Sequence, residues 1–235
     1  MRSIRFGGIA IGLLAVTAFA TLAAAQVNQP GVLTNLEVRQ LMARGEPADH
    51  AWLGDHFTAL ADRYATDAKQ HSEMARVFLL NPGRRVVANS SSDHCKRLAD
   101  LAAQSAATVR ELATHHNRLA AGIPSTAPRS SARFEAGEGA RVAWAHEKEV
   151  HDLAAKASTA ADHRTIAEYF ESIEKQYSTA VNEHVAMAQA YRAAPNRRGG
   201  DPAAHCDRLV KLSRESQAEA SAAAAEHKQA ANAAR

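Results

Sequence analysis

A long segment with a helical pattern occurs twice in this chain. The first copy reads ADHAWLGDHFTALADRYATDAKQHSEMA over residues 48–75, and the second reads ADHRTIAEYFESIEKQYSTAVNEHVAMA over residues 161–188. The two copies are 113 positions apart. The matches join Phe57 to Phe170, Tyr64 to Tyr177, His71 to His184, Met74 to Met187, and Pro82 to Pro195. So many matches among scarce residue types predict an internal duplication.

The duplication continues past the prolines at an offset of 111 positions. The matched residues are His94-Cys95 with His205-Cys206, Leu98 with Leu209, Ser105 with Ser216, and His116 with His227. His50 and His163 belong to the first part, so eight of the twelve histidines fall into four matched pairs. Each copy therefore predicts one hairpin of two helices.

Helix signals bound these hairpins. The first helix is expected to begin near Pro47 in copy one and at the capping sequence Thr159–Asp162 in copy two. The second is expected to begin within 90–93 or at Asp201-Pro202, and to end at Gly122 in copy one. Because β-branched residues are few and do not alternate, we predict an all-α fold, with two tandem helical hairpins packed as an antiparallel four-helix bundle. Short accessory helices are expected at Leu33–Arg44 and Trp144–Ala157.

Residues 1–25 have the composition of a cleavable signal peptide. Arg2 and Arg5 precede an apolar stretch, and Ala23-Ala24-Ala25 supplies small residues at the expected cleavage site. The domain organisation then predicts hairpin repeats at 26–121 and 142–235, joined by a flexible linker at 122–141 rich in Gly, Pro and Ser. We expect a periplasmic or secreted protein that does not stay inserted in the membrane.

Charge and cysteine content exclude some functions and suggest a covalent link. Without the signal peptide the chain has 26 Lys and Arg against 25 Asp and Glu, and no basic run remains that could follow a nucleic-acid backbone. The sequence contains no combination of a nucleophile and a base that would predict an enzyme. In an oxidising compartment, Cys95 and Cys206 are expected to form a disulfide, with metal thiolates as the alternative.

The histidines lie at the ends of the predicted stripes. His50 and His71 are three intervals of seven residues apart with Phe57 and Tyr64 between them, and His94 and His116 bound a stripe on the second helix. The two spans, 21 and 22 residues, are each about 32 Å long in a helix. An antiparallel hairpin should therefore bring His50 beside His116, and should bring His71 beside His94. The equivalent histidines of copy two are separated by the same 21 and 22 residues, so the same contacts are expected there.

Histidines converging from facing helices suit a transition metal, because neutral imidazole is a common ligand. We expect copper or zinc, with Met74 and Met187 as soft ligands that would favour copper. The candidate metal ligands are His50, His71, Met74, His94, His116, His163, His184, Met187, His205 and His227. Two alternatives stay open: a structural or interaction module of the cell envelope whose histidines are core polar residues, and a bundle that binds haem non-covalently. The unmatched histidines, His56, His115, His146 and His151, are expected to be solvated.

Overall fold

The computed structural model describes residues 32–81, 85–121, 149–193 and 201–234. The secondary structure of these residues is helical, without a strand. Five helices carry the fold: α1 (Asn35–Arg44), α2 (Pro47–Phe78), α3 (Arg85–Ala120), α5 (Ala160–Ala193) and α6 (Pro202–Ala233). A short helical run also covers 149–154. The all-α prediction is confirmed, whereas the predicted signal peptide and linker lie outside the described residues.

Local capping explains most of the helix boundaries. Thr34 and Glu37 form a capping box at the start of α1, and Gly45 ends that helix with a φ of 63°. At the start of α5 the Asp162 carboxylate accepts from the Thr159 amide at 3.0 Å, while the Thr159 hydroxyl accepts from the Asp162 amide at 3.1 Å. The predicted cap of the second repeat is therefore present.

One predicted boundary was wrong. The serines at 90–92 do not start α3, which already begins at Arg85. The Ser91 hydroxyl donates instead to the carbonyl of Val87 at 2.7 Å, one turn earlier in the same helix. A serine that bonds to the preceding turn is compatible with a helix interior, so it gives no start signal there.

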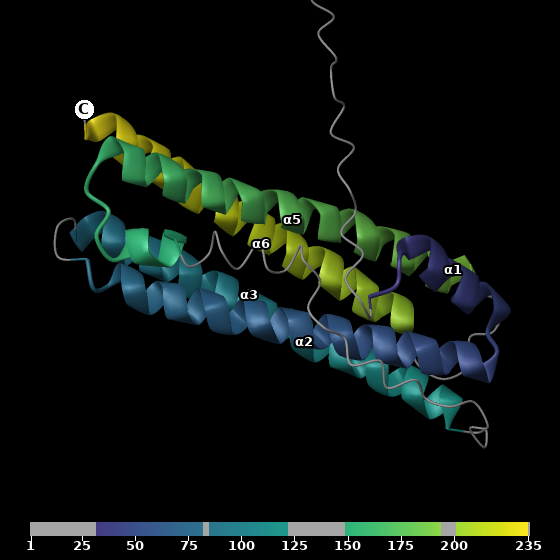
Figure 1. The fold of residues 1–235 in the computed structure, drawn as a ribbon. Coiled ribbons are helices and arrows are strands. Elements are labelled where there is room, and N and C mark those ends of the chain that lie inside the picture. The colour runs from purple at the N-terminus through teal and green to yellow at the C-terminus, as the bar shows by residue number, and fades with distance from the viewer. Residues whose placement is uncertain (1–31, 82–84, 122–148, 194–200, 235) are drawn as a thin grey trace, which may run out of the picture.

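The long helices form an antiparallel four-helix bundle (Figure 1). α2 packs against α3 and α5 against α6, and the two hairpins meet where α3 lies along α6. Ala220 and Ala224 of α6 are buried in one cluster with Cys95 and Leu98 of α3, and small side chains of this kind allow two helices to approach closely. By contrast, α2 and α5 nowhere bring their Cα atoms within 8 Å of each other.

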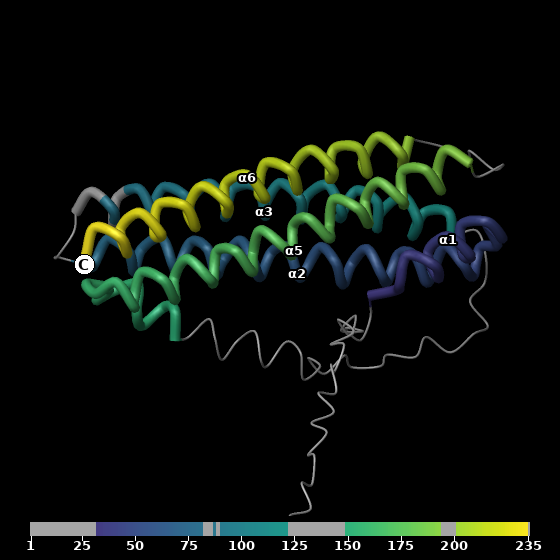
Figure 2. Tube along the Cα trace, turned by 90° about the horizontal axis from the view of Figure 1, so that it is seen from above, coloured from purple at the N-terminus to yellow at the C-terminus, as the bar shows by residue number. Residues whose placement is uncertain are grey.

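Two short helices flank the wide seam between α2 and α5. α1 contacts both of these helices at one end of the bundle, as Figure 2 shows. At the other end, Val150 and Ala154 of the short run pack with Phe78 and Phe170, and the Asn81 side-chain amide donates to the Ala157 carbonyl at 3.1 Å. The first expected accessory helix is present as α1, and the described part of the second contains the helical run 149–154; they lie at opposite ends of the seam.

The seven-residue stripe forms the core of each first helix. Phe57 and Phe170 are fully buried, and Tyr64 and Tyr177 are almost so. The stripe extends one interval further than the sequence matches alone indicated, to Phe78 in α2 and Tyr191 in α5. In the described residues, no helix is long and apolar enough to cross a membrane.

The predicted disulfide is not formed. Cys95 and Cys206 are both free thiols and both fully buried. Cys95 packs with Phe78 and Phe170 at one end of the bundle, and Cys206 packs with Leu53 and Phe57 at the other. Because α3 and α6 are antiparallel, equivalent cysteines that lie away from the centre of the helices are carried to opposite ends.

Candidate functional site

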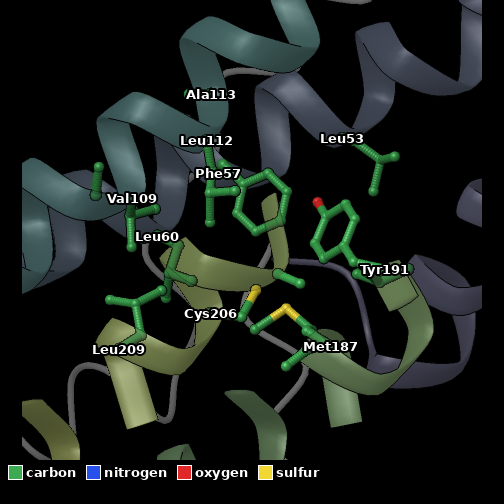
Figure 3. Packing of buried hydrophobic residues seen from close by; sticks show 14 of the residues in the cluster. Leu53, Phe57, Leu60, Val109, Leu112, Ala113, Met187, Tyr191, Cys206 and Leu209 are labelled. Carbon is green, nitrogen blue, oxygen red and sulfur yellow. The ribbon is translucent and has the colours of Figure 1, made fainter. Parts of the chain in front are cut away.

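Each end of the bundle contains a pair of histidines in direct contact. In the first pair, Nδ1 of His50 on α2 lies 3.0 Å from Nδ1 of His116 on α3. The Phe57 ring stacks on His116 with a centroid separation of 5.4 Å. A hydrogen bond of 2.6 Å joins His116 Nε2 to the Tyr191 hydroxyl of α5. Figure 3 shows Tyr191 next to Phe57 in this part of the core. The predicted approach of His50 to His116 is confirmed.

The second pair repeats this arrangement at the other end. Nδ1 of His163 on α5 lies 3.1 Å from Nδ1 of His227 on α6. Phe170 stacks on His227 at 5.8 Å, as Phe57 does on His116. The hydroxyl partner differs, since Phe78 occupies the position equivalent to Tyr191. Here Nε2 of His227 lies 3.0 Å from the Ser91 hydroxyl of α3.

The hydrogen bonds of Ser91 fix the tautomer of His227. The single hydroxyl proton of Ser91 is donated to the Val87 carbonyl. The Ser91 oxygen therefore accepts from Nε2–H of His227, and Nδ1 of a neutral His227 carries a lone pair directed at His163. The second pair thus presents a nitrogen lone pair inside the bundle.

Burial keeps the inner histidines neutral. It lowers the pKa of His116 and of His227 to about 3, and nearby histidine charges act in the same direction. Burial also lowers the pKa of His50. Neutral imidazole is the form that can bind a metal ion, and these lowered pKa values favour it at His50, His116 and His227.

The two pairs differ in their access to solvent. His116 and His227 are each 1% exposed, and His163 is 2% exposed. His50 is only partly buried. The first pair can therefore be reached from outside through His50, whereas the second is closed.

His71 and His184 are buried and belong to neither pair. Nε2 of His184 lies 2.9 Å from the Tyr64 hydroxyl. Nδ1 of His71 and Nδ1 of His184 are both buried without a hydrogen-bond partner. Burial lowers the pKa of each to about 4.

Polar side chains also lie beside the tyrosines of the stripe. Ser213 lies beside Tyr64 and Ser216 beside Tyr177, and neither serine hydroxyl makes a hydrogen bond of acceptable geometry. Asp67 also lies near Tyr177, and burial raises the pKa of this carboxyl to about 6. The middle of the core is therefore polar and poorly satisfied.

His94 and His205 do not join His71 and His184 in a second layer. His94 on α3 lies between two carboxylates of α6, with Nδ1 2.6 Å from Glu219 Oε1 and Nε2 3.2 Å from Glu226 Oε2. His205 Nδ1 lies 3.1 Å from Glu111 Oε2. Both histidines thus face the neighbouring hairpin, and the predicted approach of His71 to His94, with its equivalent in copy two, is wrong.

The helical period explains this difference. In bundles the buried stripe repeats every 3.5 residues, so 21 residues return to the same face but 22 overshoot it by about 100°. Cys95, which is 21 residues before His116, is fully buried, whereas the His94 side chain is 19% exposed. The buried position that the stripe predicted for His94 is occupied by Cys95.

The methionines are part of the apolar core. Met74 packs with Phe78 and Cys95, and Met187 packs with Tyr191 and Cys206. Figure 3 shows the sulfur atoms of Met187 and Cys206 near one another. In the described residues, no three His, Cys, Asp or Glu side chains stand in positions that could hold one metal ion.

One unmatched histidine is not solvated as expected. His56 is 4% exposed, and its Nδ1 accepts from the backbone amide of Leu33 at 2.9 Å. α1 and the chain before it cover this residue, which the pattern of α2 alone could not indicate. His115 and His151 are partly exposed, while His146 lies outside the described residues.

Sequence matching missed four side chains that complete these sites: Ser91, Tyr191, Glu219 and Glu226. Tyr191 could have been found, because it follows His184 by seven residues and continues the stripe. The other three reach their histidines across helices that are distant in sequence. No known protein family matches this chain, and neither a curated protein nor a solved structure shows significant similarity to it.

Proposed function

We propose that this protein is an exported helical bundle that binds a transition-metal ion at each of its two histidine pairs, His50–His116 and His163–His227. Copper and zinc are the metals we propose, and the role is to buffer or sequester them in the periplasm. The single observation that carries the proposal is the distance between the Nδ1 atoms, 3.0 Å in one pair and 3.1 Å in the other.

This distance suits two nitrogen ligands of one ion. Imidazole nitrogens bind Zn(II) at about 2.0–2.1 Å, so two nitrogens 3.0–3.1 Å apart would subtend an angle of about 95° at a shared ion. That angle is close to the value for neighbouring ligands in square-planar Cu(II) and below the tetrahedral value of Zn(II). Small ring movements would accommodate either ion.

The outer hydrogen bonds of the pairs also support ligation. Histidines that bind metals commonly donate the second ring N–H to an oxygen, which fixes the tautomer and the ring orientation. His227 donates in this way to Ser91, and the Tyr191 hydroxyl is in the corresponding position at His116. Both rings are further held by a stacked phenylalanine.

The number of protein ligands indicates exchangeable binding. Among the described residues no third side chain joins either pair, so water would complete the coordination. A site with open positions releases its ion more readily than a closed four-ligand site. The thioethers of Met74 and Met187 are packed in apolar clusters, so we propose Cu(II) or Zn(II) rather than Cu(I).

Titration calorimetry of the mature chain with Cu(II) and with Zn(II) tests the proposal. We expect two ions per chain in the wild type, one after either His50→Ala or His163→Ala, and none at these sites in the double variant. His151→Ala is the control, because His151 is partly exposed and belongs to neither pair. Equal stoichiometry in the wild type and the double variant would reject metal binding by the pairs.

A second function has its own supporting observation. His116 already uses both ring nitrogens, one with His50 and one with Tyr191, without any ion. The pairs could therefore be polar core contacts of a structural or interaction module of the envelope. If the double variant lowers the unfolding free energy without changing metal content, this second function replaces the first.

A further inference from the structure

The side chains that lie nearer the surface beside each histidine pair, here called its rim, differ between the two ends, although the pairs themselves are alike. The offset of 111 positions makes His205 the equivalent of His94 and makes His115 the equivalent of Glu226. At one rim the two positions are therefore His94 of α3 and Glu226 of α6. At the other rim the same two positions are His205 of α6 and His115 of α3.

The rim near His163–His227 is closed by ion pairs. His94 lies between the Glu219 and Glu226 carboxylates, at 2.6 Å and 3.2 Å. The Ser90 hydroxyl donates to Glu226 at 2.6 Å, and Arg97 lies 3.3 Å from Glu219. Both nitrogens of His94 and both carboxylates are engaged, so these groups already have partners without an ion.

The rim near His50–His116 is open. His205 Nδ1 lies 3.1 Å from Glu111 Oε2, and their side chains are 31% and 54% exposed. His115 takes the place that Glu226 has at the other rim, where Glu226 Oε2 lies 3.2 Å from the ring of His94. The duplicated backbone therefore places His115 opposite His205. Glu111 and His115 are also one helical turn apart on α3, a spacing that brings side chains together.

We propose that Glu111, His115 and His205 form a solvent-accessible acquisition site for a divalent transition-metal ion, from which the ion passes to the His50–His116 pair. The role of the site in supplying the pair rests on the proposed function. The His163–His227 end has no equivalent acquisition site, so the two pairs load at different rates.

The ligand chemistry and the exposure of the residues fit this role. Two imidazoles and one carboxylate are ligands that Zn(II) and Cu(II) accept. The His115 ring centroid is 5.2 Å from that of His116, in an edge-to-face contact. His115 is partly exposed and His116 is 1% exposed. These residues lead from the surface into the core.

One movement is required. The three side chains do not form a group that could hold one ion in the structure, and the His115 ring packs on His116. A rotation of the His115 side chain would carry its ring from His116 towards Glu111 and His205. The same rotation provides a physical route for transferring an ion inward.

A reciprocal exchange of the two equivalent residues tests the proposal. Stopped-flow mixing of the mature protein with Cu(II), followed by absorbance and by electron paramagnetic resonance of frozen samples, should show a fast and a slow loading phase in the wild type. His115→Glu should slow the fast phase by on the order of tenfold or more, the range found when a supporting residue of a metal site is lost. Glu226→His should accelerate the slow phase. His115→Gln keeps the polarity without the added charge, and circular dichroism checks the fold of each variant.

The outcomes separate the two proposals. If His115→Glu and His115→Gln both load like the wild type, the acquisition site is rejected. If His50→Ala binds as many Cu(II) ions as the wild type, and adding His115→Gln lowers that number by one, the surface site stands and the His50–His116 pair is rejected. If the wild type binds no Cu(II), both proposals fail.

Discussion

The duplicated histidines occupy three different environments at the residue scale. Within each of the two pairs, one histidine ring contacts the other. His184 contacts Tyr64 in the core. His94 and His205 contact carboxylates nearer the surface. Burial lowers the pKa of the inner rings of His116 and His227. One residue type therefore serves as a neutral donor–acceptor in the core and as a partner of carboxylates outside it.

Tyr191→Phe tests the support of His116. The hydroxyl lies 2.6 Å from Nε2 of a histidine that is 1% exposed. Its removal leaves a buried nitrogen without a partner, so the unfolding free energy should fall by about 1–2 kcal/mol. The ring should be tolerated, because Phe78 is the natural equivalent at the other end. Urea denaturation measures the change, and Ser91→Ala is the matched change at His227. Unaltered stability in Tyr191→Phe would show that the bond contributes nothing net.

At the scale of helices, the two repeats differ where α2 approaches α3. A Cβ atom added at Gly54 would lie 2.3 Å from Oδ1 of Asn117, and its three nearest atoms all belong to that side chain. The equivalent position in α5 is Ala167, which is buried. Asn117 is exposed, so its side chain rather than the backbone spacing opposes a larger residue at Gly54.

Gly54→Ala should therefore stabilise the protein once Asn117 is shortened. In an Asn117→Ala background we expect a gain of about 1 kcal/mol, since alanine is favoured over glycine by that amount inside a helix. In the wild-type background the gain should be smaller, because Asn117 must turn away. Thermal and urea unfolding of the four proteins in this cycle measure both values. A loss of stability in the Asn117→Ala background would place the limit in the helix spacing itself.

The buried histidines should make the whole molecule sensitive to acid. Burial lowers the pKa of His56, His71 and His184 to about 4, and that of His116 and His227 to about 3. An unfolded histidine titrates near pH 6.5, at about 1.4 kcal/mol per unit of difference. Above that pH neither state is protonated, so there is no penalty. As the pH falls below it, only the unfolded state takes up protons, and stability decreases until the folded histidines titrate.

We expect the free energy of unfolding to fall continuously between about pH 6.5 and pH 4. Asp67 acts in the opposite direction, since burial raises its pKa to about 6 and protonation there favours the folded state. Five histidines outweigh this one carboxyl. Urea denaturation at a series of pH values measures the slope. Replacing His71 with Gln should reduce the slope, because Gln does not titrate. A constant stability from pH 7 to pH 4.5 would contradict the expected neutral state of these rings.

The sequence by itself determined the duplication, the all-helical bundle and the two pairs His50–His116 and His163–His227. The physical reason is local: a helix fixes which residues share a face, and the spacing of 21 residues in α2 and α5 matches the period of the bundle. The lengths of two antiparallel helices then fix which residues lie at the same level.

Only the tertiary structure decided which neighbours the other histidines and the two cysteines contact. His94 meets Glu219 rather than His71, and these two partners lie on different helices, more than 100 positions apart in the sequence. The antiparallel crossing of α3 and α6 places Cys95 and Cys206 at opposite ends. The burial of His56 requires α1 and the chain before it. These are long-range contacts, and the periodicity of a single helix does not encode them.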